Sequence, residues 1–73
     1  MAFTIDEITH DTDIDAAYVR LVKTDDNERL TTLQVSDRSM YIDFDEDGHL
    51  IGIETLDASN DLPEELLDEA REL

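Results

Sequence analysis

Five residues in a twelve-residue stretch have the types and spacing of a calcium site. Residues 43–54, DFDEDGHLIGIE, fit the pattern D-x-[DN]-x-[DN]-G-x5-E. The matching residues are Asp43, Asp45, Asp47, Gly48 and Glu54. In a calcium loop of this kind, an incoming and an outgoing helix bring the carboxylates around one ion. The pattern therefore predicts a calcium site only if helices flank it.

The flanking residues favour strands instead. Residues 40–44 and 51–55 alternate apolar with polar side chains, and Gly52 stands where the second helix would begin. In a hairpin, residues 45–48 form the turn and Gly48 supplies its positive φ. The acids then point side by side into solvent. We predict this hairpin and no metal site. A calcium- or divalent-ion-binding module remains the alternative, with the ligands Asp43, Asp45, Asp47 and Glu54.

Other candidate chemistry is weaker. His10 lies among Asp11, Asp13 and Asp15, but nothing supplies the further ligands of a zinc site, so we interpret His10 as a solvated side chain. The serines lack a nucleophile-elbow context, and the two glycines do not form a phosphate-binding loop. We therefore expect no enzymatic activity and no cofactor.

Composition limits the class of protein. The 73 residues suffice for a single domain, 1–73, and the absence of cysteine excludes disulfides and thiolate metal sites. The net charge is −16, from 21 acidic and five basic residues. This charge makes nucleic acid and anionic membranes poor partners. It is typical of a strongly solvated surface, as in a high-salt cytoplasm that screens the repulsion, and the alternative is a clamp for a basic protein. No secretory signal and no membrane-spanning run is apparent, so we expect a cytoplasmic protein.

Period-two alternation predicts the strands that position these residues. The first lies around Phe3 and Ile5. The others cover residues 17–22, 30–35, 40–45 and 51–56, with breaks at 10–15, 24–29 and 36–39.

The pattern changes to helical at the C-terminus. Asp61 and Glu64 have the spacing of a capping box, and Pro63 falls in the first turn. An apolar stripe follows, formed by Leu66, Leu67, Ala70 and Leu73. We predict a helix over about 61–72. The expected fold is α+β: an antiparallel β-meander of four to five strands with this helix packed on one face.

Polar and aromatic residues in the strands outline a candidate interaction surface. We expect Arg20 and Glu54 to form a cross-strand ion pair. Alternation also predicts that one exposed sheet face carries Tyr18, Arg20, Tyr41, Asp43 and Glu54. Tyrosine and arginine are residue types that anchor protein interfaces.

The order of these residues resembles a family. ITHDTDIDAAYVRL (8–21) followed by YIDFDEDGHLIGIETLDAS (41–59) is similar to the small YuzE-like proteins of prokaryotes. The matching residues are Asp15, Tyr18, Arg20, Asp43, Asp45, Gly48, Gly52, Ile53, Glu54, Ala58 and Ser59. His10 departs from the pattern, which usually has an aromatic residue there, and MAFTIDE looks like an extension ahead of the first strand of the family. The resemblance implies no established catalytic activity, and for some similar proteins a suggested antitoxin role beside a small toxin.

Charge and resemblance together predict a protein-interaction module that binds a basic partner, as an antitoxin-like neutraliser. The ion-binding module above is one alternative. Another is a structural domain whose open sheet edge pairs with a copy of itself. We expect a monomer or a weak homodimer.

Overall fold

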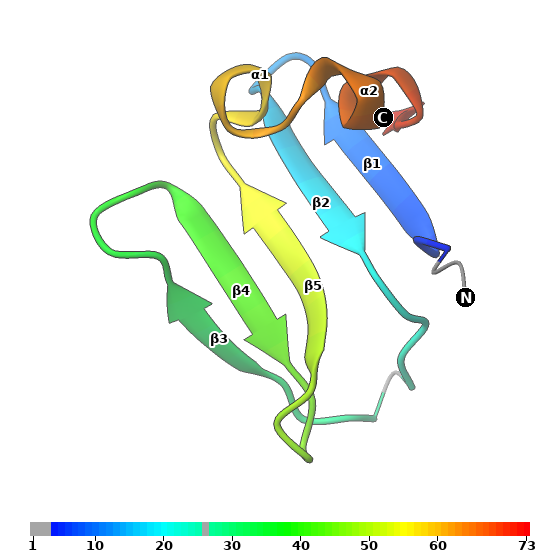
Figure 1. Cartoon of the computed structure of the whole chain (residues 1–73), viewed down its shortest axis with the longest axis vertical. Helices are drawn as coiled ribbons and strands as arrows, with labels where there is room; N and C mark the ends of the chain where they lie inside the picture. The colour runs from blue at the N-terminus through cyan, green and yellow to red at the C-terminus, as the bar shows by residue number, and fades with distance from the viewer. Residues whose placement is uncertain (1–3, 26) are drawn as a thin grey trace.

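The chain folds as a single sheet with two short helices on one of its faces (Figure 1). The computed structural model describes residues 4–25 and 27–73. The strands are β1 (Glu7–Asp11), β2 (Ala16–Arg20), β3 (Thr31–Gln34), β4 (Met40–Phe44), β5 (Leu50–Thr55) and β6 (Arg71–Glu72), and the helices are α1 (Ala58–Asp61) and α2 (Glu64–Asp68). In the described part of the chain, neither helix has the length and apolar character needed to cross a membrane.

The predicted antiparallel meander is wrong. The sheet has six strands in the order β3-β4-β5-β2-β1-β6, and it is mixed because β6 runs parallel to β1. β2 pairs with β1 on one side, as a meander requires, but on the other side it pairs with β5 instead of β3. The polarity of the side chains explains this order. Three of the four residues of β3 are polar and all four are exposed, so β3 suits an edge, whereas Ile51 and Thr55 of β5 are buried at the centre.

The first strand also differs from the prediction. Of its two predicted residues, Phe3 lies outside the described residues and Ile5 precedes β1. β1 instead continues through Asp11, which pairs with Ala16, so the predicted turn at 10–15 is shorter. The predictions for the next four strands are confirmed to within two residues at each end.

The predicted helix over 61–72 is wrong as well. Leu62 is extended, with φ −107° and ψ 141°, because the residue before a proline is disfavoured in the helical region. Asp61 therefore ends α1, and Pro63 rather than Asp61 is the N-cap of α2. The last residues leave the helix, and the Leu73 N–H donates to the His10 carbonyl at 2.9 Å.

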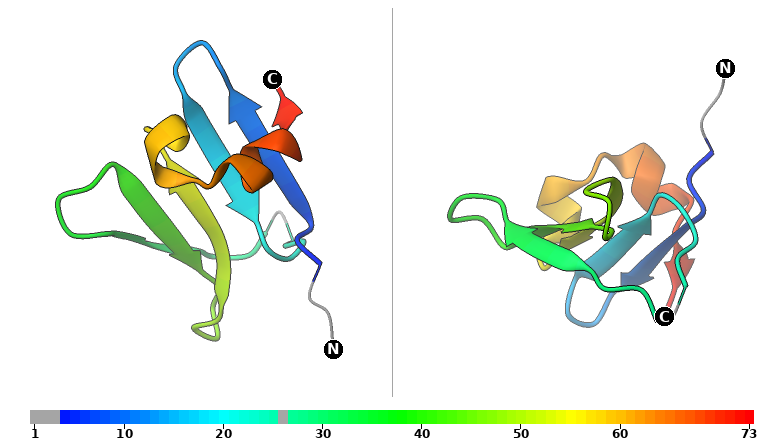
Figure 2. Two further views of the ribbon diagram at one scale, coloured as in Figure 1. Left: turned by 45° about the horizontal axis from the view of Figure 1, so that its top comes forward. Right: turned by 90° about the horizontal axis from the view of Figure 1, so that it is seen from below.

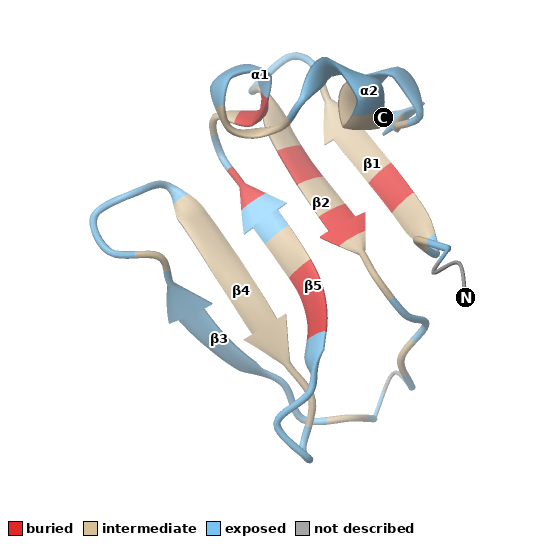
Figure 3. Ribbon diagram, viewed as in Figure 1, coloured by how far each residue is buried: buried red, intermediate tan, exposed pale blue. Residues whose placement is uncertain are grey.

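The core lies between the helices and the central strands. Its buried apolar residues are Ile8, Ala17, Val19, Ile51 and Ala58. Figures 1 and 2 show both helices over one end of β1, β2 and β5, while the β3–β4 hairpin extends away from them. The burial of the strands follows from this arrangement. β3 is exposed along its whole length and β4 is only half-buried, as Figure 3 shows.

Candidate functional site

Strand register places the five candidate interaction residues on one face of the sheet. Glu54 lies opposite Tyr18 on one side and opposite Tyr41 on the other, whereas Arg20 and Asp43 both lie opposite Gly52. Directly paired residues share a face. Thr55, the next residue along, points the other way and contacts α1. We call the helix-free face with Tyr18, Arg20, Tyr41, Asp43 and Glu54 the polar face.

Tyr18 lies across the middle of the polar face. Its hydroxyl donates a hydrogen bond of 2.8 Å to Asp43 Oδ2, two strands away. The ring reaches Asp43 by passing directly over Gly52, where a Cβ atom would lie 2.0 Å from the Tyr18 oxygen. The Thr32 hydroxyl donates to the other carboxylate oxygen of Asp43 at 2.6 Å. Glycine at position 52 is therefore a packing requirement, and Asp43 is fixed by two hydroxyl donors.

These surroundings keep the Tyr18 hydroxyl protonated. Burial raises the pKa of the Tyr18 phenol to about 12, and the hydrogen bond to Asp43 and the charges of Asp43 and Glu54 act in the same direction. Arg20 opposes them. At neutral pH the phenol is therefore a hydrogen-bond donor.

We expect Tyr18 to titrate near pH 12. Between its ordinary pKa of 10.0 and about 12, the folded protein keeps a proton that the unfolded chain has lost. The free energy of unfolding should therefore fall as the pH rises through this window. Absorbance titration should show a late phenolate step that Tyr18→Phe removes. A late step that persists in this variant would contradict the assignment.

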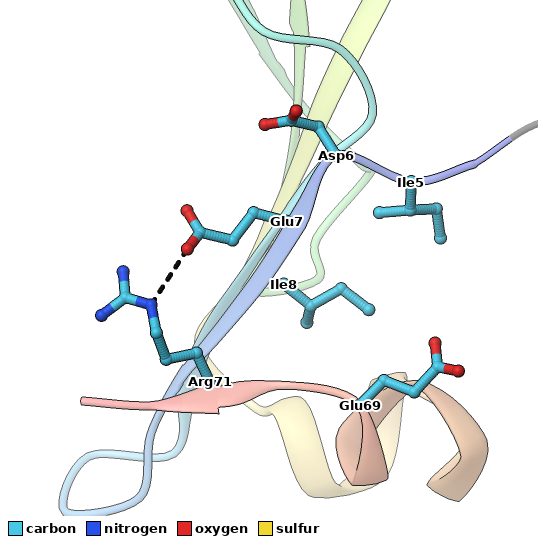
Figure 4. Close-up of a pocket in the computed structure, with 6 residues that line it drawn as sticks. All are labelled: Ile5, Asp6, Glu7, Ile8, Glu69 and Arg71. Atoms are coloured by element: carbon cyan, nitrogen blue, oxygen red, sulfur yellow. Dashed lines mark hydrogen bonds and ion pairs between the residues drawn. The ribbon is translucent and has the colours of Figure 1, made fainter.

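The predicted ion pair between Arg20 and Glu54 is wrong. Arg20 Nε donates to Asp6 at 2.8 Å, and Arg20 Nη2 donates to Glu7 at 3.1 Å. The other carboxylate oxygen of Glu7 accepts from Arg71 Nε at 2.9 Å, as Figure 4 shows. Arg20 faces Glu7 directly in the β1–β2 register, which alternation within single strands does not reveal. Glu54 keeps its exposed position on the polar face.

A second cluster joins the β1–β2 turn to the start of α1. Asp15 has a φ of 55°, and its backbone oxygen accepts from the Ala58 N–H at 2.9 Å. Its carboxylate accepts from His10 Nε2 at 2.9 Å and from the hydroxyl and N–H of Ser59 at 2.9 and 3.1 Å. The bonds from His10 and then from the Ser59 backbone hold the pKa of Asp15 below its usual value. The interpretation of His10 as a solvated side chain is wrong, because only 14% of this side chain is exposed.

With both clusters described, the sequence can be compared with known families. Residues 7–59 match the family described as protein of unknown function DUF2283. The chain belongs to this family. No curated protein and no solved structure matches the chain. The DUF2283 segment runs from β1 to the start of α1, so it contains both partners of the Tyr18–Asp43 and Asp15–Ser59 contacts. The narrower YuzE-like name remains a resemblance.

A third cluster lies at the end of the DUF2283 segment. The Thr55 hydroxyl donates to Asp61 at 2.6 Å and accepts from the Asp57 N–H at 3.0 Å. Arg38 donates to the other carboxylate oxygen of Asp61. These contacts, with the Thr55 bond first and the Arg38 bond next, hold the pKa of Asp61 below its usual value. Sequence reasoning assigned Asp61 to a helix cap and missed this link between β5, α1 and the 36–39 turn.

The calcium-loop pattern of the DUF2283 segment forms a hairpin turn, as predicted. Asp45 Oδ1 accepts from the N–H groups of Asp47 and His49, each at 2.9 Å, and Gly48 has a φ of 85°. The His49 N–H contributes most to keeping the pKa of Asp45 low.

The four acids of the pattern do not converge on one point. Asp43 belongs to β4 and binds Tyr18 and Thr32, and Glu54 belongs to β5. Within residues 4–25 and 27–73, the one group of three potential metal ligands whose donor atoms lie within 4.8 Å of one another contains Asp45, Asp47 and His49. Asp45 Oδ1 in this group already accepts backbone N–H groups of the turn.

Proposed function

We propose that this DUF2283 chain is a protein-interaction module whose polar face binds a basic protein and neutralises it, in the manner of an antitoxin. The observation that carries the proposal is a surface hollow of ≈ 220 Å³ beside Tyr18. Carboxylates and exposed apolar side chains meet there: the lining includes Thr9, Asp11, Ile14, Tyr18, Glu54 and Leu73. Such a hollow fits an arginine or lysine, with the stem on the apolar groups and the cation beside the acids.

The rigidity of Tyr18 supports this role. Its ring is held over Gly52 by the bond to Asp43, so its position is fixed before any partner arrives. Side chains ordered in advance reduce the entropy cost of association. Tyr41 lies on the same face and is half-buried, which gives the surface a second aromatic group. Aromatic residues of this kind are frequent hot spots in interfaces.

The negative charge of the chain favours basic partners and speeds their association. A net charge of −16 attracts cationic proteins over roughly the Debye length, about 8 Å at physiological ionic strength. The neutralising role rests on the family resemblance of the sequence. The raised pKa of Tyr18 keeps its phenol protonated near neutral pH, so this phenol is not a base under those conditions.

The proposal predicts salt-sensitive binding that depends on Glu54. The immobilised chain should retain basic proteins at low ionic strength, and calorimetric titration of a retained protein should give an affinity that falls as salt rises. Glu54→Gln should weaken binding about five- to tenfold, which corresponds to about 1–1.4 kcal/mol.

Glu64→Gln is the matched control. It makes the same chemical change on exposed α2, away from the polar face, and should change the affinity less than twofold. If no basic protein is retained at low salt, or if the two variants weaken binding equally, the proposal fails.

A further inference from the structure

The outer edge of the sheet suggests a second docking surface, separate from the polar face. β3 ends the strand order, and its residues Thr31–Gln34 are all exposed. The Val35 N–H donates to the Met40 carbonyl at 2.8 Å, so it points toward β4. In an antiparallel pair every second residue points its N–H toward the neighbouring strand, so the N–H groups of Leu33 and Thr31 also point toward β4. The backbone N–H and C=O groups of Thr32 and Gln34 therefore point away from the sheet, at an edge where no described strand follows.

This edge lacks the features that protect most edge strands. Natural edges are commonly guarded by lysine, proline, a bulge or a covering helix. Among the described helices and strands, β3 alone has no charged residue, although 36% of the chain is charged. Figures 1 and 2 show both helices over β1, β2 and β5, so neither helix covers β3, although Arg38 of the β3–β4 turn donates to Asp61 of α1.

Apolar side chains lie beside the open edge. On the helix-bearing side of the sheet, Leu33 is paired with Ile42, and Phe44 lies two residues beyond Ile42 on the same side. Leu33 is 55% exposed. An added strand presents alternate side chains to each side of the sheet, so its apolar residues would continue this surface.

Charge at the start of β3 identifies the kind of strand that fits. A hollow of ≈ 310 Å³ lies there, between the chain before β3 and the β4–β5 turn, where the Arg29 N–H binds Glu46 at 3.2 Å. Four carboxylates and no described basic side chain line it: those of Asp25, Glu28, Glu46 and Asp47, together with Asn27. This hollow complements a lysine or arginine, whereas a second copy of this chain would bring a like charge of −16.

We propose that β3 accepts an extended segment of a partner protein as a seventh strand, with alternating apolar residues along the edge and a basic residue in the acidic hollow. Thr32 and Gln34 supply the main-chain hydrogen bonds, and Leu33 supplies part of the apolar contact. This strand addition does not depend on the polar face.

The probe is the peptide acetyl-KTVTVTK-amide, which has a lysine at each end and so fits either strand direction. Hydrogen exchange of the ¹⁵N-labelled chain should show at least tenfold slower exchange at the Thr32 and Gln34 amides on saturation. The Leu33 amide already faces β4 and is the internal control. The same peptide N-methylated at residues 2–6 keeps its charge but loses all five central backbone donors, and should bind at least tenfold more weakly.

Variants separate the contributions. Gln34→Pro removes an outward N–H without breaking the ladder to β4, and should weaken binding at least tenfold, whereas Gln34→Ala should change it less than twofold. Glu28→Gln with Asp47→Asn should weaken binding several-fold more than Glu64→Gln with Glu65→Gln on α2. Glu54→Gln should leave the preference for the unmethylated peptide unchanged, which distinguishes this surface from the polar face. If Gln34→Pro does not fold, the N-methylated peptide still tests the edge.

Three results would overturn the proposal. The first is equal binding of both peptides, which would indicate attraction by charge alone. The second is absence of binding, or protection centred away from β3. The third is protection of Thr32 and Gln34 that grows with protein concentration in the absence of peptide, with dimers in sedimentation, because the occupant would then be a second copy.

Discussion

Replacing Gly52 by alanine is expected to lower the free energy of unfolding by about 1–3 kcal/mol. The new Cβ would lie 2.0 Å from the Tyr18 oxygen and 2.5 Å from Cζ, so the ring must leave its position. The Tyr18 hydroxyl then loses its bond to Asp43. An ordinary strand glycine gives the opposite result, since alanine there stabilises by about 0.5–1 kcal/mol. Urea denaturation of the wild type and of Gly52→Ala measures the difference in the free energy of unfolding.

A double-mutant cycle tests the cause. In a Tyr18→Ala background the ring is gone, so Gly52→Ala should be neutral or slightly stabilising. Tyr18→Phe removes only the hydroxyl and should leave most of the steric penalty in place. If Gly52→Ala costs the same with and without the Tyr18 ring, the clash is not the reason for glycine at this position.

Replacing Thr55 by valine is expected to lower the free energy of unfolding by about 1–3 kcal/mol as well. The side chains have nearly the same shape, and Thr55 is 0% exposed, so the change removes a buried hydroxyl with little change in packing. The Asp57 N–H loses its acceptor, and Asp61 loses a donor. Thermal and urea denaturation measure the loss.

The cost of Thr55→Val should also depend on pH. The Thr55 hydrogen bond is the largest cause of the low pKa of Asp61, so this pKa should rise in the variant. A lowered folded-state pKa stabilises above the unfolded value, and this contribution is lost as the pH falls through the folded-state pKa. The difference between wild type and variant should therefore shrink below about pH 4, near the usual aspartate pKa.

Thr31→Val is the control for this substitution. It makes the same change at an exposed position of β3 and should alter stability by less than about 0.5 kcal/mol. Equal losses at positions 31 and 55 would mean that the buried network does not matter. Carboxyl NMR of Asp61 in the two variants gives an independent measurement.

Local pattern was enough to predict the 43–54 hairpin. Alternation on both sides and a glycine at position 48 identified two strands and a turn despite a complete calcium-loop match. The alternation of apolar and polar residues also placed Tyr18, Tyr41 and Glu54 on one face of the sheet. The structure agrees, because Glu54 is paired directly with both tyrosines. Whether this face binds a partner stays a prediction.

Strand order could not be read in the same way. Alternation reports which side of a strand is apolar and does not report its neighbour, so the insertion of β5 beside β2 was missed. The contact of Tyr18 with Asp43 follows from that order. The contact of Arg20 with Glu7 follows instead from the β1–β2 register, because β1 begins at Glu7. At the C-terminus a capping-box spacing suggested one helix. Pro63 instead disfavours the helical conformation at Leu62, so the chain is extended there and α1 ends at Asp61.

The two margins of the sheet are unequal, and this limits how far assembly can proceed. On one side the tail of the chain lies along β1 as β6, a strand of only two residues. So short a segment offers little template for further pairing. Growth by edge-to-edge pairing of sheets requires two receptive edges per molecule, and the part of the chain that the structure describes offers one, β3. Edge pairing should therefore stop after a single event, giving discrete complexes instead of fibrils.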